Sequence, residues 1–456
     1  MKSMTSQERT HLMLHQPVSR VISRLAVPTI ISMLITNIYN MADTFFVSQL
    51  GTSASGAVGV VFSAMAMIQA LAFTIGQGGG INVSHALGSG RDEDARRFCS
   101  TAIVTAFTLG AMLAALALCN LDGLVRFLGA TETIVPYAMD YATYIFYAAP
   151  FMMASLAMNN LLRFQGLAVY GMVGVTTGGV LNMILDPILI FGFNLGASGA
   201  AIATALSQAV SFFILLIMCN TRPDAISIRL RDFAFSGRIY GRIFYNGVPS
   251  LGRQGIAAIA TVVLNTAAGI YGDAAIAALS IVNRFVMFIN SAVIGFGQGF
   301  QPVCGFNFGA GQYSRVREAF RFAVKVTTIL LVCLVGVTML LAQPIITVFR
   351  PDDPDVIRIG TLALRLQLLT MPLWGFITIS NMFTQSIGYG VRATIISAAR
   401  QGFCLIPMLL ILPSFLDLLG LQMAQPIADI ITFILALAIV GGILSRMKAQ
   451  PDQEVA

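Results

Sequence analysis

The sequence predicts an all-α membrane protein with twelve transmembrane helices in two related six-helix lobes. Three observations lead to this fold class. First, hydrophobic residues make up 57% of the 456 residues and charged residues only 10%, whereas soluble domains carry roughly 25% charged residues. Second, the uncharged stretches are long enough to cross a bilayer. Third, the second half of the chain repeats landmarks of the first. The lipid bilayer is the solvent that suits this composition.

Twelve apolar segments lie between charged or Gly/Pro-rich breaks, and each approaches the roughly 20 residues that a spanning helix needs. We predict helices at 22–48, 54–84, 98–120, 134–161, 167–193, 197–219, 242–271, 275–307, 321–343, 356–387, 391–414 and 421–445. No stretch between them is long enough for a soluble domain. The expected organisation is a polar segment 1–21, a first lobe 22–219, a linker 220–241, a second lobe 242–445 and a tail 446–456.

The distribution of Lys and Arg predicts the orientation of these helices. With the N-terminus inside, nineteen of the 27 basic residues fall in inner segments, and only Arg126, Arg350 and Arg358 fall in outer ones. Short cytoplasmic loops are enriched in Lys and Arg, so we expect both termini in the cytoplasm. The net charge of +7 is spread over seven short segments. A nucleic acid partner is therefore not expected, because such proteins gather their basic residues in a patch.

An internal repeat appears when the chain is shifted against itself by 221 or 222 residues. The matched pairs are Pro28 with Pro249, Gly51 with Gly272, Gly90 with Gly311, Pro150 with Pro372, Asn159 with Asn381 and Gly166 with Gly388. Most of these residue types constrain or free the backbone, so the two halves share a shape. Two six-helix halves of the same orientation form a parallel repeat, which is typical of secondary transporters.

Polar residues inside the first lobe form the main candidate site. Asp43 and Asp186 are acids within predicted spans, where a charge is costly and usually functional. Tyr39 precedes Asp43 by one turn, and Asn182 precedes Asp186 by one turn, so each pair shares a helix face. Pro187 removes a backbone N–H and thereby leaves the carbonyl of residue 183 as an extra acceptor. Thr204, early in the next segment, is expected at the same depth in the outer half of the lobe.

These hard oxygen ligands suit Na⁺ or a shared proton, and the ligands expected for Na⁺ are Asp43, Asn182, Asp186 and Thr204. The alternative is structural: the Asn–Asp pair holds a kink and Thr204 bonds its own helix. The repeat favours the functional interpretation. Asp43 aligns with Leu264, and Asp186 aligns with residues 406–408, none of which is acidic, whereas a structural requirement would more plausibly appear in both halves.

A third intramembrane acid, Asp429, lies in the last segment together with Gln425. It is a possible second polar site, but a contact that holds a kink is the favoured interpretation. No nucleophile–base arrangement, histidine cluster or phosphate loop is found. We therefore expect no enzymatic activity and no cofactor apart from a coupling ion.

Several stretches resemble the MATE (multidrug and toxic-compound extrusion) family, in particular its DinF-like and MepA-like prokaryotic branches. They are LAVPTIISMLITNIYNMADTFFVSQLG at 25–51, the glycine loop with trailing arginines at 88–97, LNMILDPILIFGFNLGASGAAIATALSQ at 181–208 and GFNFGAGQYSRVREAF at 305–320. The resemblance implies an antiporter that exports cationic or amphipathic small organic compounds in exchange for Na⁺ or H⁺ by alternating access. It also implies a monomer in the bilayer of a bacterial inner membrane.

The same resemblance implies a set of site residues in the first lobe: Tyr39, Asp43, Tyr141, Asn159, Asn182, Asp186 and Thr204, with Pro28 at a bend of the first helix. A structural role stays open for Asn159, because its segment limits place it near the inner end and because it has the repeat partner Asn381. The NorM-like branch also uses acids on its seventh and tenth helices, and this sequence has none in either segment.

Three other functions were weighed. A lipid-linked precursor flippase of the same superfamily would need a basic central cavity and often fourteen helices. A major-facilitator carrier would need a different loop after the second helix from the one at 88–97. A membrane enzyme would need a catalytic constellation. The sequence leaves open the identity of the exported compounds and the choice between Na⁺ and H⁺.

Overall fold

The computed structural model describes residues 6–349, 351 and 353–453. In this part of the chain every regular element is a helix and none is a strand. Twelve of these helical segments are long and apolar enough to cross a membrane, which confirms the predicted fold class. Lys2 and Arg350, which entered the charge count, lie outside the described residues. The cytoplasmic location of the termini stays a prediction.

The spanning helices are α2 (Val18–Ser48), α3 (Thr52–Gly88), α4 (Asp92–Cys119), α6 (Val135–Phe164), α7 (Ala168–Pro187) with the π-helical turn η1 (Ile188–Gly192), α8 (Gly196–Thr221), α9 (Gly237–Gly269), α10 (Asp273–Gly309), α11 (Tyr313–Phe349), α12 (Pro354–Ser386), α13 (Gly390–Ala398) with the π-helical turn η3 (Ala399–Phe403) and α14 (Leu405–Ile411), and α15 (Pro413–Lys448). Three short elements were not predicted: α1 (Ser6–His15), α5 (Leu121–Phe127) and the 3₁₀ turn η2 (Leu230–Asp232).

Most spanning helices extend beyond the predicted limits at their polar ends. α4, for example, begins at Asp92 where residue 98 was expected, and its first turn holds three acids. Acids stabilise the positive N-terminal end of a helix, so the charged residues that we placed in loops belong to helices that project beyond the apolar core.

The chain divides into two compact units. The first comprises residues up to Pro17 and Val27–Gly247, and the second comprises Val18–Ala26 and Val248–Ala456. These limits differ from the expected lobes, because each unit takes in the first turns of a helix whose remainder belongs to the other unit. The exchanged turns end beside Pro28 in α2 and Pro249 in α9, which are the matched prolines of the repeat.

Close backbone contacts hold the exchanged turns in place. A Cβ atom on Gly78 of α3 would lie 1.9 Å from the carbonyl oxygen of Ile243, in the first unit. A Cβ atom on Gly299 of α10 would lie 2.5 Å from the Cα atom of Ala26, in the second unit. Small residues allow such close helix contacts in membranes. Gly78 ends the run Gly76-Gln77-Gly78, and Gly299 ends the run Gly297-Gln298-Gly299, which matches it at the repeat offset of 221 residues. The role of these two glycines is therefore tight packing.

The backbone of the matched glycines confirms that the halves share a shape. Gly51 and Gly272, which precede α3 and α10, have φ angles of +109° and +92°. Gly166 and Gly388 have φ angles of +82° and +81°. Side-chain-bearing residues rarely adopt these angles, so the repeated glycines are required by the same turns in both halves.

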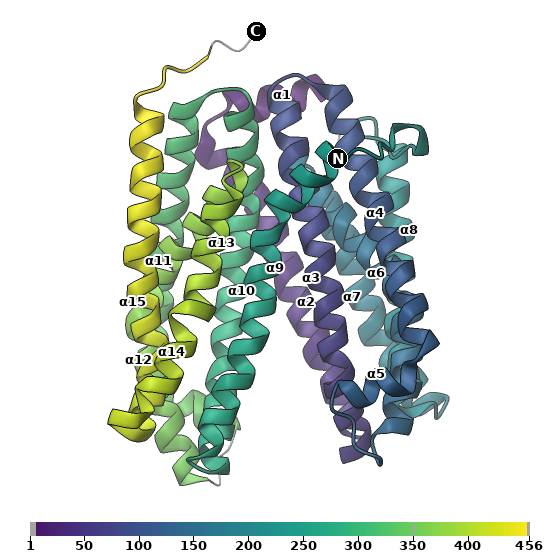
Figure 1. Cartoon of the computed structure of the whole chain (residues 1–456), viewed down its shortest axis with the longest axis vertical. Coiled ribbons are helices and arrows are strands. Elements are labelled where there is room, and N and C mark those ends of the chain that lie inside the picture. Colours follow the sequence, from purple (N-terminus) through teal and green to yellow (C-terminus); the bar gives the residue numbers. More distant parts are fainter. Residues whose placement is uncertain (1–5, 350, 352, 454–456) are drawn as a thin grey trace. The chain divides into compact units, whose positions relative to one another are not determined.

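In the first unit, α6 is the central helix and contacts α3, α4, α7 and α8. α1 lies at one end of these helices, and α5 lies at the opposite end (Figure 1). Arg9 of α1 is buried and donates to the backbone carbonyl of Asp224, which anchors α1 to the segment after α8. Burial lowers the pKa of the Arg9 guanidinium, and the nearby Asp224 opposes that shift.

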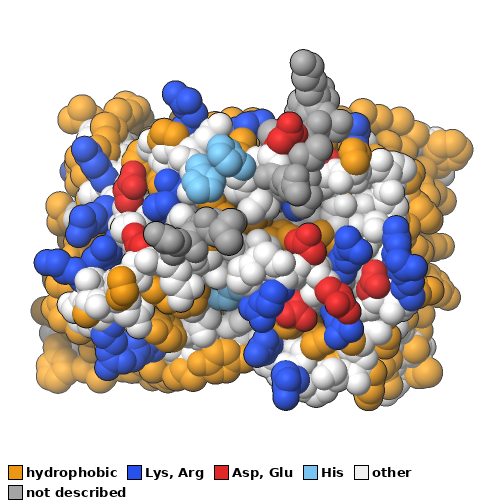
Figure 2. All heavy atoms as spheres, turned by 90° about the horizontal axis from the view of Figure 1, so that it is seen from above, with side chains coloured by type: hydrophobic (Ala, Val, Ile, Leu, Met, Phe, Trp, Pro, Cys, Tyr) orange, Lys and Arg blue, Asp and Glu red, His pale blue; other side chains and the backbone are white. Residues whose placement is uncertain are grey.

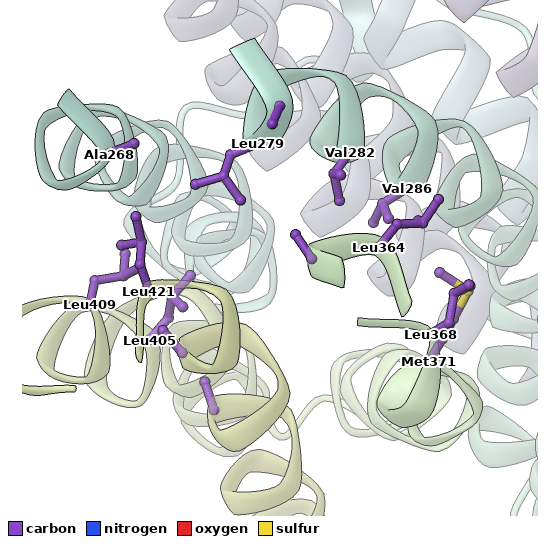
Figure 3. Packing of buried hydrophobic residues seen from close by; sticks show 14 of the residues in the cluster. Ala268, Leu279, Val282, Val286, Leu364, Leu368, Met371, Leu405, Leu409 and Leu421 are labelled. Atoms are coloured by element: carbon purple, nitrogen blue, oxygen red, sulfur yellow. The ribbon is translucent and has the colours of Figure 1, made fainter. Parts of the chain in front are cut away.

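In the second unit, α12 has the corresponding central position and contacts α10, α11, α13 and α15. Its core consists mainly of aliphatic side chains from α9, α10, α11, α12, α14 and α15, among them Val282, Leu368 and Leu409 (Figure 3). Charged side chains gather on the end of the molecule that carries α1, while hydrophobic ones lie around its edge (Figure 2). This separation is the one expected of a protein whose flanks contact lipid.

Candidate functional site

Six of the seven predicted coupling residues lie together in the first unit. They come from four helices: Tyr39 and Asp43 from α2, Tyr141 from α6, Asn182 and Asp186 from α7, and Thr204 from α8. We call these six residues the first-unit cluster. Asp186 is fully buried and Tyr141 is fully buried beside it, and the charges of Asp43 and Asp186 influence each other and Tyr141.

Asn182 links two helices within the first-unit cluster. Its side-chain nitrogen Nδ2 donates to Oδ1 of Asp186 at 3.3 Å and to Oγ1 of Thr204 at 3.2 Å. The predicted face shared by Asn182 and Asp186 is therefore present, and Thr204 contacts it from α8. The structural alternative for Thr204, a bond only to its own helix, does not describe this arrangement.

Three buried oxygen atoms of the first-unit cluster have no hydrogen-bond donor among the described residues. They are Oδ1 of Asp43, Oδ2 of Asp186 and Oδ1 of Asn182. Burying a polar atom without a partner is costly, and the cost is larger for a carboxylate. No arginine, lysine or histidine among the described residues forms an ion pair with either acid. The cluster therefore offers unsatisfied acceptors that a proton or a small cation would satisfy.

Glycines in α7 bring the helices of the first-unit cluster together. A Cβ atom on Gly179 would lie 3.0 Å from Cδ1 of Tyr39 on α2. A Cβ atom on Gly178 would lie 3.1 Å from Cβ of Ser211 on α8. The adjacent glycines thus allow α7 to pack closely against both neighbours, which places Asp186 between α2 and α8.

The chain beyond Asp186 leaves regular helical geometry. Pro187 ends α7, and the π-helical turn η1 follows it. π-helical turns occur frequently at functional sites. Gly199 of α8 packs against this turn, since a Cβ there would lie 2.8 Å from the carbonyl oxygen of Leu189. The sequence predicted the free carbonyl before Pro187 but not the π-helical turn.

Asn159 lies away from the first-unit cluster. Its oxygen Oδ1 would be 2.4 Å from a Cβ atom on Gly171, near the start of α7. Asp186 is fifteen residues farther along α7, which corresponds to roughly 22 Å of helix. Its repeat partner Asn381 has a packing role, because it donates to the carbonyl of Ala393 at 2.7 Å. The structure therefore favours the structural role that the segment limits left open for Asn159.

Two further polar residues of α8 border the first-unit cluster and were not predicted. The side chain of Gln208 lies close enough to the hydroxyl of Tyr39 to interact with it. Ser207 is buried, and its Oγ has no hydrogen-bond partner among the described residues. Both follow Thr204 at helical spacing, so the pattern Thr204, Ser207, Gln208 was the sequence signal that could have revealed them.

The acid of the second unit has a different environment. Asp429 is fully buried and accepts from four side chains: the indole of Trp374, the hydroxyl of Thr370 at 3.4 Å, Nε of Arg400 at 3.0 Å and Nε2 of Gln425 at 3.0 Å. The guanidinium of Arg400 also stacks on Trp374 with its carbon 4.1 Å from the ring centroid. We call Thr370, Trp374, Arg400, Gln425 and Asp429 the second-unit cluster. Its carboxylate is already neutralised and fully hydrogen-bonded.

Among the described residues, no group of three or more His, Cys, Asp or Glu side chains could hold a metal ion. The first-unit cluster instead offers hard oxygen ligands of three kinds: the carboxylates of Asp43 and Asp186, the amide of Asn182 and the hydroxyl of Thr204.

The MatE family model matches the chain twice, at residues 28–188 and 249–411. The two matches begin at the paired prolines of the internal repeat and cover most of the chain. The protein belongs to the MATE family. Membership makes it a multi-pass membrane transporter of the multidrug efflux type rather than an enzyme, and it explains both the twelve helices and the repeat.

Two curated relatives are similar to this chain over nearly their whole length. The multidrug export protein MepA of Staphylococcus haemolyticus (strain JCSC1435) is 26% identical over 430 residues, which is 94% of each chain. MepA of Staphylococcus aureus (strain MSSA476) is 28% identical over 442 residues, which is 96% of each chain. Among solved structures, a MATE protein in complex with MaL6 has a TM-score of 0.92 at 26% identity, covering 96% of this chain and 99% of that one.

Proposed function

We propose that this MATE transporter is an antiporter that couples the export of cationic or amphipathic organic compounds to the entry of Na⁺ or H⁺ at the first-unit cluster. The observation that carries the proposal is the set of three unsatisfied buried oxygens on Asp43, Asn182 and Asp186. An unpaired buried carboxylate is costly until a proton or cation neutralises it. Ion binding is therefore favourable in this arrangement.

Coupling requires that ion binding change the shape of the protein. The ligands belong to α2, α7 and α8, so an ion bound by Asp43 and Asp186 would draw α2 towards α7. The proline of α2, Pro28, lies where the helix passes from the second unit to the first. Proline removes a helix hydrogen bond and permits a bend. We propose that Pro28 is the point at which α2 bends as the ion enters and leaves.

One chain is sufficient for this mechanism, because every residue of the first-unit cluster belongs to one unit of one polypeptide. We therefore propose a monomer in the bacterial inner membrane, with both termini in the cytoplasm. The excess of basic residues in the segments on that side supports this orientation.

Efflux of ethidium from cells that express single-residue variants tests the coupling site. Asp43→Asn and Asp186→Asn keep the size of each side chain but remove its charge, and we expect each to abolish efflux while the protein still inserts. The matched control is Asp140→Asn, because Asp140 is an exposed acid of α6 in the same unit. Efflux at the wild-type rate by Asp43→Asn would refute the proposal.

Proteoliposomes separate the two coupling ions. Purified protein is reconstituted, and a Na⁺ gradient or a pH gradient is imposed while the other is held at zero. The gradient that drives uptake of the organic cation identifies the coupling ion, and we expect the response to disappear in Asp186→Asn. Transport that persists without either gradient would exclude antiport.

A further inference from the structure

The second unit contains an open pocket of about 770 Å³ at the end of its helices where α11 begins and α15 ends. Its lining comes from α11, from Lys448 of α15 and from the first turn of α2, which belongs to this unit. The pocket does not include any residue of the second-unit cluster. None of its lining residues belongs to the first-unit cluster either.

Basic side chains dominate this pocket. Arg317, Arg321 and Lys325 are spaced four residues apart on α11 and therefore share one helix face, and Lys448 adds a fourth positive charge. Glu318 is the one acid in the lining. We call the pocket lined by these four positive residues the basic pocket.

Three of the four cations in the basic pocket have no ion-pair partner among the described residues. They are Arg321, Lys325 and Lys448. Arg317 is close enough to Asp452 of the tail to influence it electrostatically. Like charges that share a pocket repel one another, and an anion bound between them removes that repulsion.

The basic pocket lies at the depth of lipid head groups. After Lys325, α11 continues to Phe349 without a charged residue, a run of about 24 residues or roughly 36 Å, slightly more than the roughly 30 Å hydrocarbon core. Lys325 therefore marks the edge of the hydrocarbon, and Arg321 and Arg317 lie one and two turns beyond it. Lys448 likewise follows the last apolar residues of α15. Figure 2 shows Lys and Arg side chains gathered on the face at this end.

We propose that the basic pocket binds the phosphate head group of an anionic phospholipid from the adjoining leaflet. The phosphate would lie among Arg321, Lys325 and Lys448, while the half-buried ring of Phe322 offers apolar contact to the glycerol or acyl chain. Basic pockets between transmembrane helices bind such head groups. A zwitterionic lipid would bind less well, because its choline group would meet the same positive charges.

Lipid binding to purified protein tests this proposal without any measurement of transport. Detergent-solubilised protein is titrated with short-chain phosphatidylglycerol, phosphatidylcholine or soluble glycerophosphoglycerol, and bound lipid is counted by native mass spectrometry. We expect phosphatidylglycerol to bind at least tenfold more tightly than either of the others. Equal binding of phosphatidylcholine, or equal binding of the soluble head group, would overturn the proposal of an anionic lipid site.

Charge-neutralising variants locate the site. The double variant Arg321→Gln with Lys325→Gln removes two exposed charges, and we expect phosphatidylglycerol to bind roughly thirtyfold more weakly. The matched control is Arg284→Gln with Arg358→Gln, which removes two exposed arginines of the same unit outside the pocket. Unchanged binding in the first variant, or an equal loss in the control, would overturn the assignment to this pocket.

Discussion

The fully hydrogen-bonded carboxylate of Asp429 provides the sharpest test of the contrast between the two polar clusters. Four side chains donate to it, and one of them is the guanidinium of Arg400. Asp429→Asn would remove the negative charge and turn one acceptor oxygen into a donor that faces other donors. We expect the variant to be less stable but to retain ion-coupled efflux, because the wild-type carboxylate has no acceptor left for a coupling ion.

The size of the effect follows from the burial of the pair. Removing one partner of a buried ion pair costs about 3–5 kcal/mol, because the remaining charge stays in a poorly solvating environment. Asp429 is 0% exposed and the side chain of Arg400 is 14% exposed. Since water reaches Arg400 to some extent, the lower end of that range applies. We therefore expect the free energy of unfolding to fall by about 3 kcal/mol.

The assay uses the only tryptophan of the chain. Trp374 lies in the second-unit cluster, so its fluorescence during denaturation by detergent reports directly on this region. Asp140→Asn serves as the control for the same chemical change at an exposed position. A combined Arg400→Met and Asp429→Leu variant should recover most of the lost stability, since apolar residues of similar volume can replace a buried pair. A loss below about 1 kcal/mol in Asp429→Asn would refute the reasoning, because it falls short of the magnitude for a broken buried pair.

Two further predictions concern packing and the C-terminal tail. Gly247→Ala should lower the free energy of unfolding of the first unit by about 1–3 kcal/mol, because the added Cβ would lie 2.0 Å from the carbonyl oxygen of Thr74. The control is Gly241→Ala on the same helix, where the added Cβ meets open space. Equal unfolding curves for the two variants would contradict the prediction. Hydrogen bonds from Ser314 at the start of α11 lower the pKa of Asp452 in the tail. These contacts therefore stabilise docking of the tail on α11 when the pH is above the ordinary Asp pKa of about 3.9. The stabilisation is lost as the pH falls through the lower pKa of the docked state. A spin label on the tail should gain mobility in that acid range, and an Asp452→Asn protein should lose this pH dependence; an immobile label throughout would contradict it.

The sequence predicted the fold best at positions where one residue type has a single physical role. Uncharged stretches of bilayer length predicted the twelve spans, and the matched glycines predicted the repeat that their φ angles display. Acids within apolar segments are rare and costly, so Asp43 and Asp186 were identified as candidates without knowledge of their neighbours. The extensions of the spanning helices beyond the membrane were not predicted, and neither were the short helices α1 and α5. Hydropathy detects burial in lipid and gives no signal for helical residues outside it.

The site was predictable only in part, because helix faces meet through contacts that spacing within one helix does not reveal. Gln208 and Ser207 follow Thr204 on α8, which packs against α7. Asn159 belongs to α6 and lies beside Gly171 near the start of α7, fifteen residues before Asp186. The partners of Asp429 come from α12, η3 and α15, separated by up to 59 residues in the chain. No local pattern links Trp374 and Arg400 to that acid.

The amino-acid sequence by itself determined that this protein lies in a membrane and that acids lie within its first half, since both follow from the cost of placing charge or free backbone groups in hydrocarbon. It also determined that the halves repeat, since the matched prolines and glycines constrain the backbone in the same way. Only the tertiary structure decided which acids are satisfied. Asp429 meets Arg400 because π-helical η3 packs on α15, whereas no cation reaches Asp43 and Asp186 from the helices described around them. The difference between a neutralised and an unsatisfied carboxylate is a property of the neighbours that folding supplies, and it distinguishes the structural acid from the acids that we propose bind the coupling ion.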